Sequence, residues 1–204
     1  MYNLGEQFTF DYSKAIANKE NIIQGENYRF TVLSERLIRM EYSEEGFFEN
    51  RPTELVWYRN MPPVKFEKTE DSKYLQIKTK YFELNYVKNK SFAGSKLNPT
   101  ANLNVKLLNT DRVWYYNHPE VRNYGAPSFS LDDNTGDPKL QKSLYSVDGF
   151  VSIDDSNTNV FTESGVLEKK ESNSKDIYLF MYLKDFALCL KDYYMITGSP
   201  ALIP

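Results

Sequence analysis

The sequence contains almost no cysteine or histidine and has no long apolar run. Its 204 residues include one cysteine, Cys189, and one histidine, His118. A single cysteine excludes an internal disulfide and suits a reducing compartment. The longest strongly apolar run, residues 177–183, falls far short of the about 20 residues that a membrane-spanning helix needs. A Gly-rich phosphate loop and a Cys/His metal spacing are also missing. We therefore predict no membrane span, no metal and no other cofactor.

The chain also has little excess of one charge sign over the other. The net charge is −3, and acidic and basic residues are interspersed along the chain. This pattern favours neither nucleic acid nor an anionic membrane as a partner. The first residues lack the basic and apolar regions of a signal peptide, so we expect a cytoplasmic protein.

What the chain has in abundance is aromatic residues and short alternating segments. Tyr, Phe and Trp make up 15% of it, and aromatic residues favour strands, where most of them fill the core. Apolar residues alternate with polar ones in short runs separated by turn residues, and helical periodicity is not seen before residue 185. The pattern predicts an all-β fold, an antiparallel two-sheet β-sandwich. The expected strands are 7–12, 28–33, 38–42, 54–58, 64–68, 74–79, 81–87, 103–108, 112–116, a short strand or turn at 161–166, and 177–183.

Three parts are predicted along the chain. Residues 1–27 form an extension, residues 28–183 the β-sandwich, and residues 184–204 a helix and a connector. In the first hairpin Arg39 and Glu41 face away from the apolar set, which predicts one buried face. Residues 177–183 are nearly all apolar, as in a strand covered on both faces. Asp185 is a candidate N-cap for the helix, which Gly198 and Pro200 end.

Residues 146–156 form the most distinctive stretch. The turn dipeptide Asp148-Gly149 precedes a short apolar run, which ends at Asp154, Asp155 and Ser156. Three neighbouring carboxylates could hold a cation or transfer protons. Acidic residues at the two ends of a strand are more often solvated turn formers, and we expect that role here.

This stretch resembles a segment of the N-terminal domain in glycoside hydrolase family 31, the α-glucosidases and α-xylosidases. Residues 28–42 are similar to that family's opening hairpin, and residues 176–204 are similar to the connector that leads into its catalytic (β/α)8 barrel. The resemblance implies a sandwich similar to galactose mutarotase. It also implies that this chain is part of a larger retaining enzyme that acts on α-linked oligosaccharides.

The resemblance places the reacting carboxylates outside this chain. A barrel typically needs about 250 residues of its own, and neither Trp57 nor Trp114 begins the family's nucleophile motif. We therefore assign no catalytic residue. The expected partner is the enzyme's own barrel, and Tyr193, Tyr194, Leu202 and Ile203 are its candidate contacts.

A long irregular segment, residues 118–142, is the candidate rim of a sugar pocket. Residues 123–132 partly resemble a family loop that reaches toward the barrel's sugar site, although Ala126-Pro127 replaces a Gly-Thr pair and Asp133 replaces the final Gly. Amide, carboxylate and aromatic groups suit sugar hydroxyls and ring faces. The candidate rim residues are Asn123, Tyr124, Phe129 and Asp132.

Two other functions stay open, a stand-alone carbohydrate-binding module and a mutarotase-like epimerase. The epimerase uses histidines as acid together with a carboxylate base, and this chain has only His118, in a Pro-rich loop where a solvated turn is the simpler role. Cys189 lies on the apolar side of the expected helix, so we expect a buried structural thiol.

Overall fold

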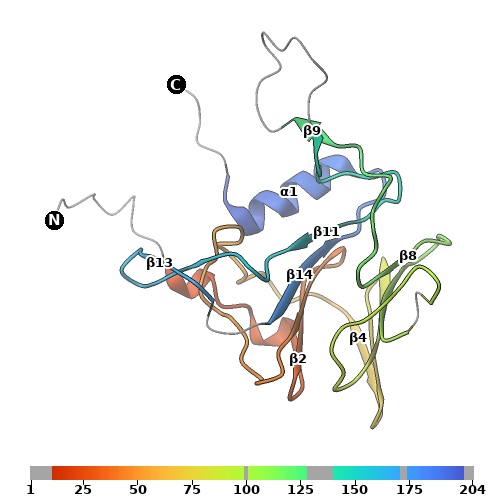
Figure 1. The fold of residues 1–204 in the computed structure, drawn as a ribbon, viewed down its shortest axis with the longest axis horizontal. Helices are drawn as coiled ribbons and strands as arrows, with labels where there is room; N and C mark the ends of the chain where they lie inside the picture. The colour runs from red at the N-terminus through yellow and green to blue at the C-terminus, as the bar shows by residue number, and fades with distance from the viewer. Residues whose placement is uncertain (1–10, 99–100, 128–139, 171–173, 200–204) are drawn as a thin grey trace.

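The chain folds as two five-stranded antiparallel sheets packed face to face (Figure 1), which confirms the expected sandwich. The computed structural model describes residues 11–98, 101–127, 140–170 and 174–199. The first sheet has the order β1 (Ile22–Gln24), β2 (Tyr28–Ser34), β3 (Leu37–Tyr42), β14 (Lys175–Phe180) and β11 (Val151–Asp154). The second has the order β4 (Glu67–Glu70), β5 (Tyr74–Lys78), β6 (Phe82–Val87), β7 (Leu103–Leu107) and β8 (Val113–Tyr115).

The remaining elements are short. They are the 3-10 turns η2 (Tyr12–Lys14) and η3 (Lys19–Asn21), the pair β9 (Ala126–Pro127) and β10 (Leu140–Gln141), the pair β12 (Val160–Phe161) and β13 (Leu167–Glu168), and the helix α1 (Phe186–Thr197).

The main core lies between the two sheets and is rich in aromatic rings. Strand alternation turns Phe30 of β2 and Tyr86 of β6 toward each other, with ring centroids 5.3 Å apart. Phe92 packs against both rings at 5.9 and 5.5 Å. Trp114 of β8 is 1% exposed in the same cluster. Offset and edge-on ring pairs of this kind add to the free energy of burying the rings.

A second apolar cluster covers the other face of the first sheet. Helix α1 lies on the side of β14 and β11 away from β4 (Figure 1), and its Cys189 and Ile196 pack with Tyr178 and Phe180 of β14. The helix begins as expected, because the Asp185 carboxylate accepts a hydrogen bond from the Leu188 N–H at 3.3 Å. It ends at Gly198, whose φ is 89°.

Both faces of the first sheet are therefore covered, and this confirms the double burial expected for residues 177–183. It also makes the expected single buried face of the first hairpin wrong, because Arg39 and Glu41 are 1% and 2% exposed. The sequence pattern marks charged positions, and here it could not tell a solvated face from a buried one.

Several expected elements differ from the structure. Residues 54–58 form no strand. They pack instead against the C-terminal end of α1, where the Trp57 and Tyr58 N–H groups both donate to the Ile196 carbonyl. The strand expected at 64–68 begins later, at Glu67. The strand expected at 7–12 lies mostly outside the described residues, and Tyr12 starts a 3-10 turn. The short strand or turn expected at 161–166 is the connection between β12 and β13.

Candidate functional site

The Asp148-Gly149 turn comes directly before β11 and packs against Leu183, which follows β14 at the start of the connector. Gly149 has φ of 76°, and a Cβ added there would lie 2.8 Å from the Leu183 Cα, so only glycine fits. The Leu183 N–H donates to the Gly149 carbonyl at 2.9 Å. On the same turn, the Ser146 hydroxyl donates to the Phe150 carbonyl at 2.6 Å. The turn thus fixes where the chain leaves the sandwich.

The three carboxylates of this stretch have different environments. Asp154 is exposed, as expected of a turn former. Asp148 is only 8% exposed and pairs with Arg122, whereas Asp155 is 0% exposed. The expectation of solvated turn formers is therefore wrong for Asp148 and Asp155, because segments distant in sequence cover them.

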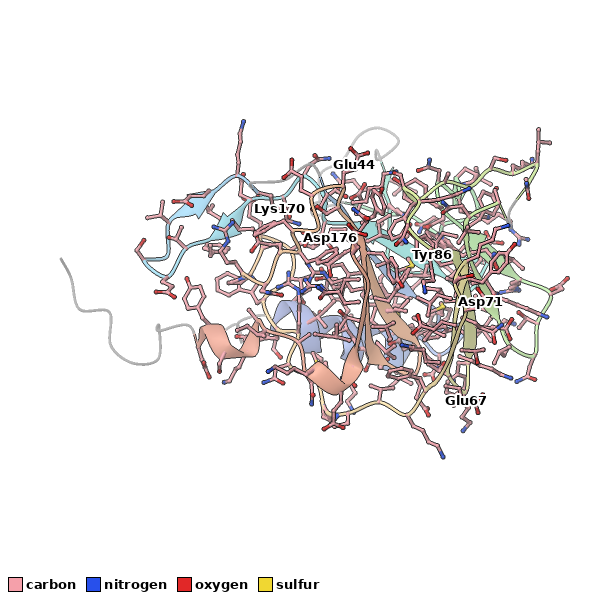
Figure 2. The ribbon with its side chains drawn as sticks, turned by 90° about the horizontal axis from the view of Figure 1, so that it is seen from below. Glu44, Glu67, Asp71, Tyr86, Lys170 and Asp176 are labelled. Carbon is pink, nitrogen blue, oxygen red and sulfur yellow. The ribbon has the colours of Figure 1, made fainter. Side chains whose placement is uncertain are left out.

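Asp155 belongs to a buried network of charges on the outer face of the first sheet. Arg39 of β3 makes a two-pronged ion pair with Asp176 of β14, at 2.8 and 2.7 Å. Lys170 lies 3.0 Å from the Asp176 carboxylate (Figure 2) and also contacts Asp155. The other charged members of the network are Arg29, Glu41 and Arg59. Arg29 also donates to the Glu49 backbone carbonyl at 3.0 Å.

The Asp155 and Asp176 carboxylates are committed to this network. Burial raises the pKa of Asp155, and the neighbouring Asp176 charge raises it further. For Asp176 burial also acts upward, but Arg39 and Lys170 outweigh it and hold the pKa well below its usual value. Both groups are sealed from solvent, at 0% and 1% exposure. A substrate cannot reach them, so they cannot serve as a glycosidase pair.

The expected rim loop is anchored at its base on the edge strand β11. The Glu120 carboxylate accepts the Ser152 N–H at 2.9 Å, and the Lys142 ammonium donates to the Ser152 carbonyl at 2.6 Å. Lys142 also lies 2.6 Å from Glu120. These contacts occupy backbone groups that an unpaired strand edge would otherwise offer to another strand. We name this set, Glu120, Lys142 and Ser152, the loop clamp.

Asn123 closes the same loop a little further along. Its Oδ1 accepts the Gly125 and Ser143 N–H groups at 2.9 and 2.8 Å, and its Nδ2 donates to the Ser143 carbonyl at 2.9 Å. Its amide is thus engaged within the loop. Tyr124, in contrast, is 54% exposed. Phe129 and Asp132 lie outside the described residues.

One side of α1 presents apolar groups to solvent. Phe186 and Leu190, one turn apart, are 40% and 39% exposed. The Phe186 ring also meets Tyr124 and Tyr145, with centroids 6.3 and 4.8 Å away. The helix thereby brings the rim loop and its own exposed side into one surface, which we call the α1 patch and define by Phe186, Leu190, Tyr124 and Tyr145.

The two expected tyrosines of the helix lie beside this patch. Tyr193 and Tyr194 are half-buried and contact each other, with centroids 5.7 Å apart. Tyr193 also lines a hollow of about 400 Å³ together with Lys142, Leu144 and Ile153. Leu202 and Ile203 lie outside the described residues.

His118 is held in a turn but is not freely solvated. Its Nδ1 accepts the Glu120 N–H at 3.0 Å, and its ring packs on Tyr115 and Phe150 at 4.7 and 4.9 Å. Burial lowers its pKa. Cys189 is 2% exposed, which confirms the expected buried thiol, and burial raises its pKa to about 12.

Within residues 11–98, 101–127, 140–170 and 174–199, no three His, Cys, Asp or Glu side chains come together as a metal site would require. None of the helices in these ranges has the length and apolarity needed to cross a bilayer.

Comparison with known proteins yields structural matches only. No family model and no curated protein sequence matches the chain. Two solved structures of a glycoside hydrolase family 31 dextranase from Flavobacterium johnsoniae, one with isomaltotriose and one with glucose, match it at 17% identity and TM-scores of 0.43 and 0.42. Each match covers 87% of this chain and 26% of the dextranase chain. The chain thus spans about a quarter of the dextranase length, and its function is argued below from its own residues.

The buried network is the feature that sequence reasoning missed. Its signal was Arg39 and Glu41 in an otherwise apolar strand, with Asp176 just before an apolar run. Charges at such positions need partners when the strand is covered on both faces. The signal becomes readable only once the cover over the first sheet is known.

Proposed function

We propose that this chain is the N-terminal β-sandwich of an α-glycosidase similar to glycoside hydrolase family 31. In the intact enzyme, the barrel would cleave α-linked glucosyl or xylosyl bonds with retention, using two carboxyl groups about 5 to 5.5 Å apart. The sandwich would contribute a docking surface and part of the pocket rim. The burial of Asp155 and Asp176 supports the assignment of the cleavage step to the barrel, because a substrate cannot reach these two carboxylates.

One observation carries the proposal: the three segments that resemble the family come together in space. Residues 28–42 form β2 and β3, residues 176–180 lie in β14, and residues 151–154 form β11, which are four neighbouring strands of the first sheet. The segment that begins at residue 176 continues from β14 into α1. Segments more than 100 residues apart therefore build one surface, from which the chain leaves toward its C-terminal end.

The α1 patch is the proposed contact with the barrel. Its two helical members are about 40% exposed although they are large and apolar, and contiguous apolar surface of this kind marks interaction sites. Tyr193 and Tyr194 would complete the contact from the helix, and Leu202 and Ile203 would complete it from the connector.

The rim loop is proposed to narrow the substrate pocket. Asn123 acts as a positioning residue, because its amide is engaged within the loop base. Tyr124 is an exposed member of the α1 patch and would offer its ring to a sugar face. Phe129 and Asp132 belong to the same proposal as further rim contacts.

Substitution of the patch tests the docking role. In the polypeptide encoded by the whole reading frame, the double variant Phe186→Ser/Leu190→Ser should lower both the thermal midpoint and the kcat/KM for an α-glucoside. In the 204-residue chain alone, it should cost about 1 kcal/mol or less, because partly exposed sites tolerate change. Val166→Ser is the control, since Val166 is 57% exposed on the turn between β12 and β13. Equal effects of the double variant in both polypeptides would refute the docking role.

A further inference from the structure

The outer face of the second sheet carries a row of uncharged polar side chains. Cross-strand pairing places Thr69, Gln76, Asn85, Asn104 and Tyr115 side by side across β4 to β8. In β5 to β8 the core residues alternate with the members of this row, so the row lies on the face away from the core. Its β7 and β8 members, Asn104 and Tyr115, are buried, at 7% and 6% exposure.

The next row on the same face is charged. It runs through Lys78 of β5, Glu83 of β6 and Lys106 of β7. Charge alternation of this kind is ordinary for a solvated sheet face. The row of uncharged polar side chains beside it differs from this pattern, because it brings together hydrogen-bonding groups that carry no charge.

A shallow groove lies over one end of this row. It has a volume of about 300 Å³, and Thr69, Tyr74, Gln76 and Asn85 are among the residues that line it. Tyr74 is 51% exposed. The turn that follows β4 fixes its position, because the Asp71 carboxylate accepts the Tyr74 N–H at 2.7 Å. Figure 2 shows Asp71 and Glu67 toward opposite ends of β4.

The two amides of the groove, Gln76 and Asn85, are hydrogen-bonded to each other and still have donors and an acceptor that are not used. The Gln76 Nε2 donates to the Asn85 Oδ1 at 3.0 Å, and the Asn85 Nδ2 donates to the Glu83 carboxylate at 3.3 Å. Each amide nitrogen carries a second hydrogen, and the Gln76 Oε1 has no hydrogen-bond partner among the described residues. The pair thus offers fixed donors and an acceptor to a ligand.

The charged groups at the groove have partners within the chain. The Asp71 carboxylate accepts the Lys73 and Tyr74 N–H groups, each at 2.7 Å, and the Lys73 ammonium lies over the Tyr74 ring, 5.0 Å from its centroid. Glu70 lies 2.6 Å from the Lys68 ammonium and 3.3 Å from the Lys88 ammonium. The groove therefore favours a neutral ligand over an anion. An aromatic ring beside paired amides suits a sugar, whose C–H face packs on the ring while its hydroxyls donate to and accept from the amides.

We propose that this groove binds one pyranose unit of a neutral oligosaccharide. Tyr74 supplies the ring face that Lys73 does not cover, and Gln76 and Asn85 bind vicinal hydroxyls. Because the groove is shallow and open, a dissociation constant on the order of 1 mM is expected. This site does not depend on the α1 patch. The groove lies on the outer face of the second sheet, whereas α1 packs on the outer face of the first sheet.

A nuclear magnetic resonance titration of the ¹⁵N-labelled chain tests the proposal. Maltotriose and xylotriose are the probes, added to tens of millimolar. Saturable shift changes are expected at the amides of β4, β5 and β6. Tyr74→Ala and Gln76→Ala should each weaken binding by about 2- to 10-fold, while Tyr74→Phe keeps the ring and most of the affinity. Lys78→Ala, in the neighbouring charged row, is the matched control and should bind as the wild type does.

Three results would overturn the proposal. They are the absence of saturable shifts with either sugar, shifts that cluster away from these strands, and Tyr74→Ala and Gln76→Ala variants that bind as the wild type does. Because Tyr74 is half-exposed, its variants should fold, and the unliganded spectrum verifies this. None of these results bears on the docking of a barrel, which the α1 variants test separately.

Discussion

Removing one carboxylate from the buried network should be among the most damaging single changes in the molecule. Asp176→Asn keeps the shape of the side chain but leaves Arg39, 1% exposed, and Lys170, whose side chain is 4% exposed, without their principal counterion. Breaking a buried ion pair on one side typically costs about 3–5 kcal/mol. A chain of this size shifts its thermal midpoint by about 2–4 °C per kcal/mol, so we expect a fall of about 6–20 °C.

Urea unfolding followed by tryptophan fluorescence measures this loss. Glu70→Gln is the matched control, because Glu70 forms its ion pairs at the surface, where solvent screens them and they add little to stability. The double variant Arg39→Met/Asp176→Leu removes both charges and should recover most of the lost stability. A loss below about 1 kcal/mol for Asp176→Asn, equal to that of the control, would refute the reasoning.

Three further predictions concern the loop and the helix. Burial lowers the pKa of His118 below its ordinary value of 6.5. The contribution of the neutral imidazole to the free energy of unfolding is therefore complete above pH 6.5 and is lost as the pH falls through the lowered pKa. Unfolding free energies between pH 7.5 and 5 should therefore drop more steeply for the wild type than for His118→Gln, and parallel curves would contradict this. Glu120→Ala should speed hydrogen exchange at the Ser152 amide, whose N–H it accepts at 2.9 Å, whereas Glu120→Gln, which keeps an acceptor, should change it little. Since burial raises the pKa of Cys189 to about 12, a disulfide reagent at pH 8 should label it only when urea unfolds the chain, and rapid labelling of the folded chain would contradict its burial.

Local pattern was enough to predict the strands and the helix start. Alternation identified the strands from β2 to β8 within a few residues, because all of them except the exposed β4 place one face on the main core. Asp185 was readable as an N-cap because it precedes a helical apolar pattern and carries a side-chain acceptor.

What covers the outer face of the first sheet could not be predicted. The segment at residues 54–58 looks like a strand, yet its N–H groups at Trp57 and Tyr58 bond to the end of α1. That contact depends on where the helix packs, which is a property of the whole fold. For the same reason the sequence could not show that Asp155 is buried, since Lys170 and Arg59 reach it from distant segments.

The candidate site was predictable only in part. The helix tyrosines and the rim loop were chosen from resemblance, and the described residues bring Tyr124 next to Phe186, 6.3 Å between ring centroids. The loop clamp was not anticipated, because it depends on a side-chain contact between Glu120 and an edge strand more than 30 residues later.

The central proposal is that the chain belongs to a larger α-glycosidase whose reacting carboxylates lie outside these 204 residues. Turnover of a chromogenic α-glucoside, measured for this chain alone and for the polypeptide encoded by the whole reading frame, tests that proposal most directly. The account predicts no turnover above the uncatalysed rate by the chain alone and measurable turnover by the longer polypeptide. Turnover by the chain alone that Asp148→Asn abolishes would contradict it, as would a reading frame that stops directly after Pro204.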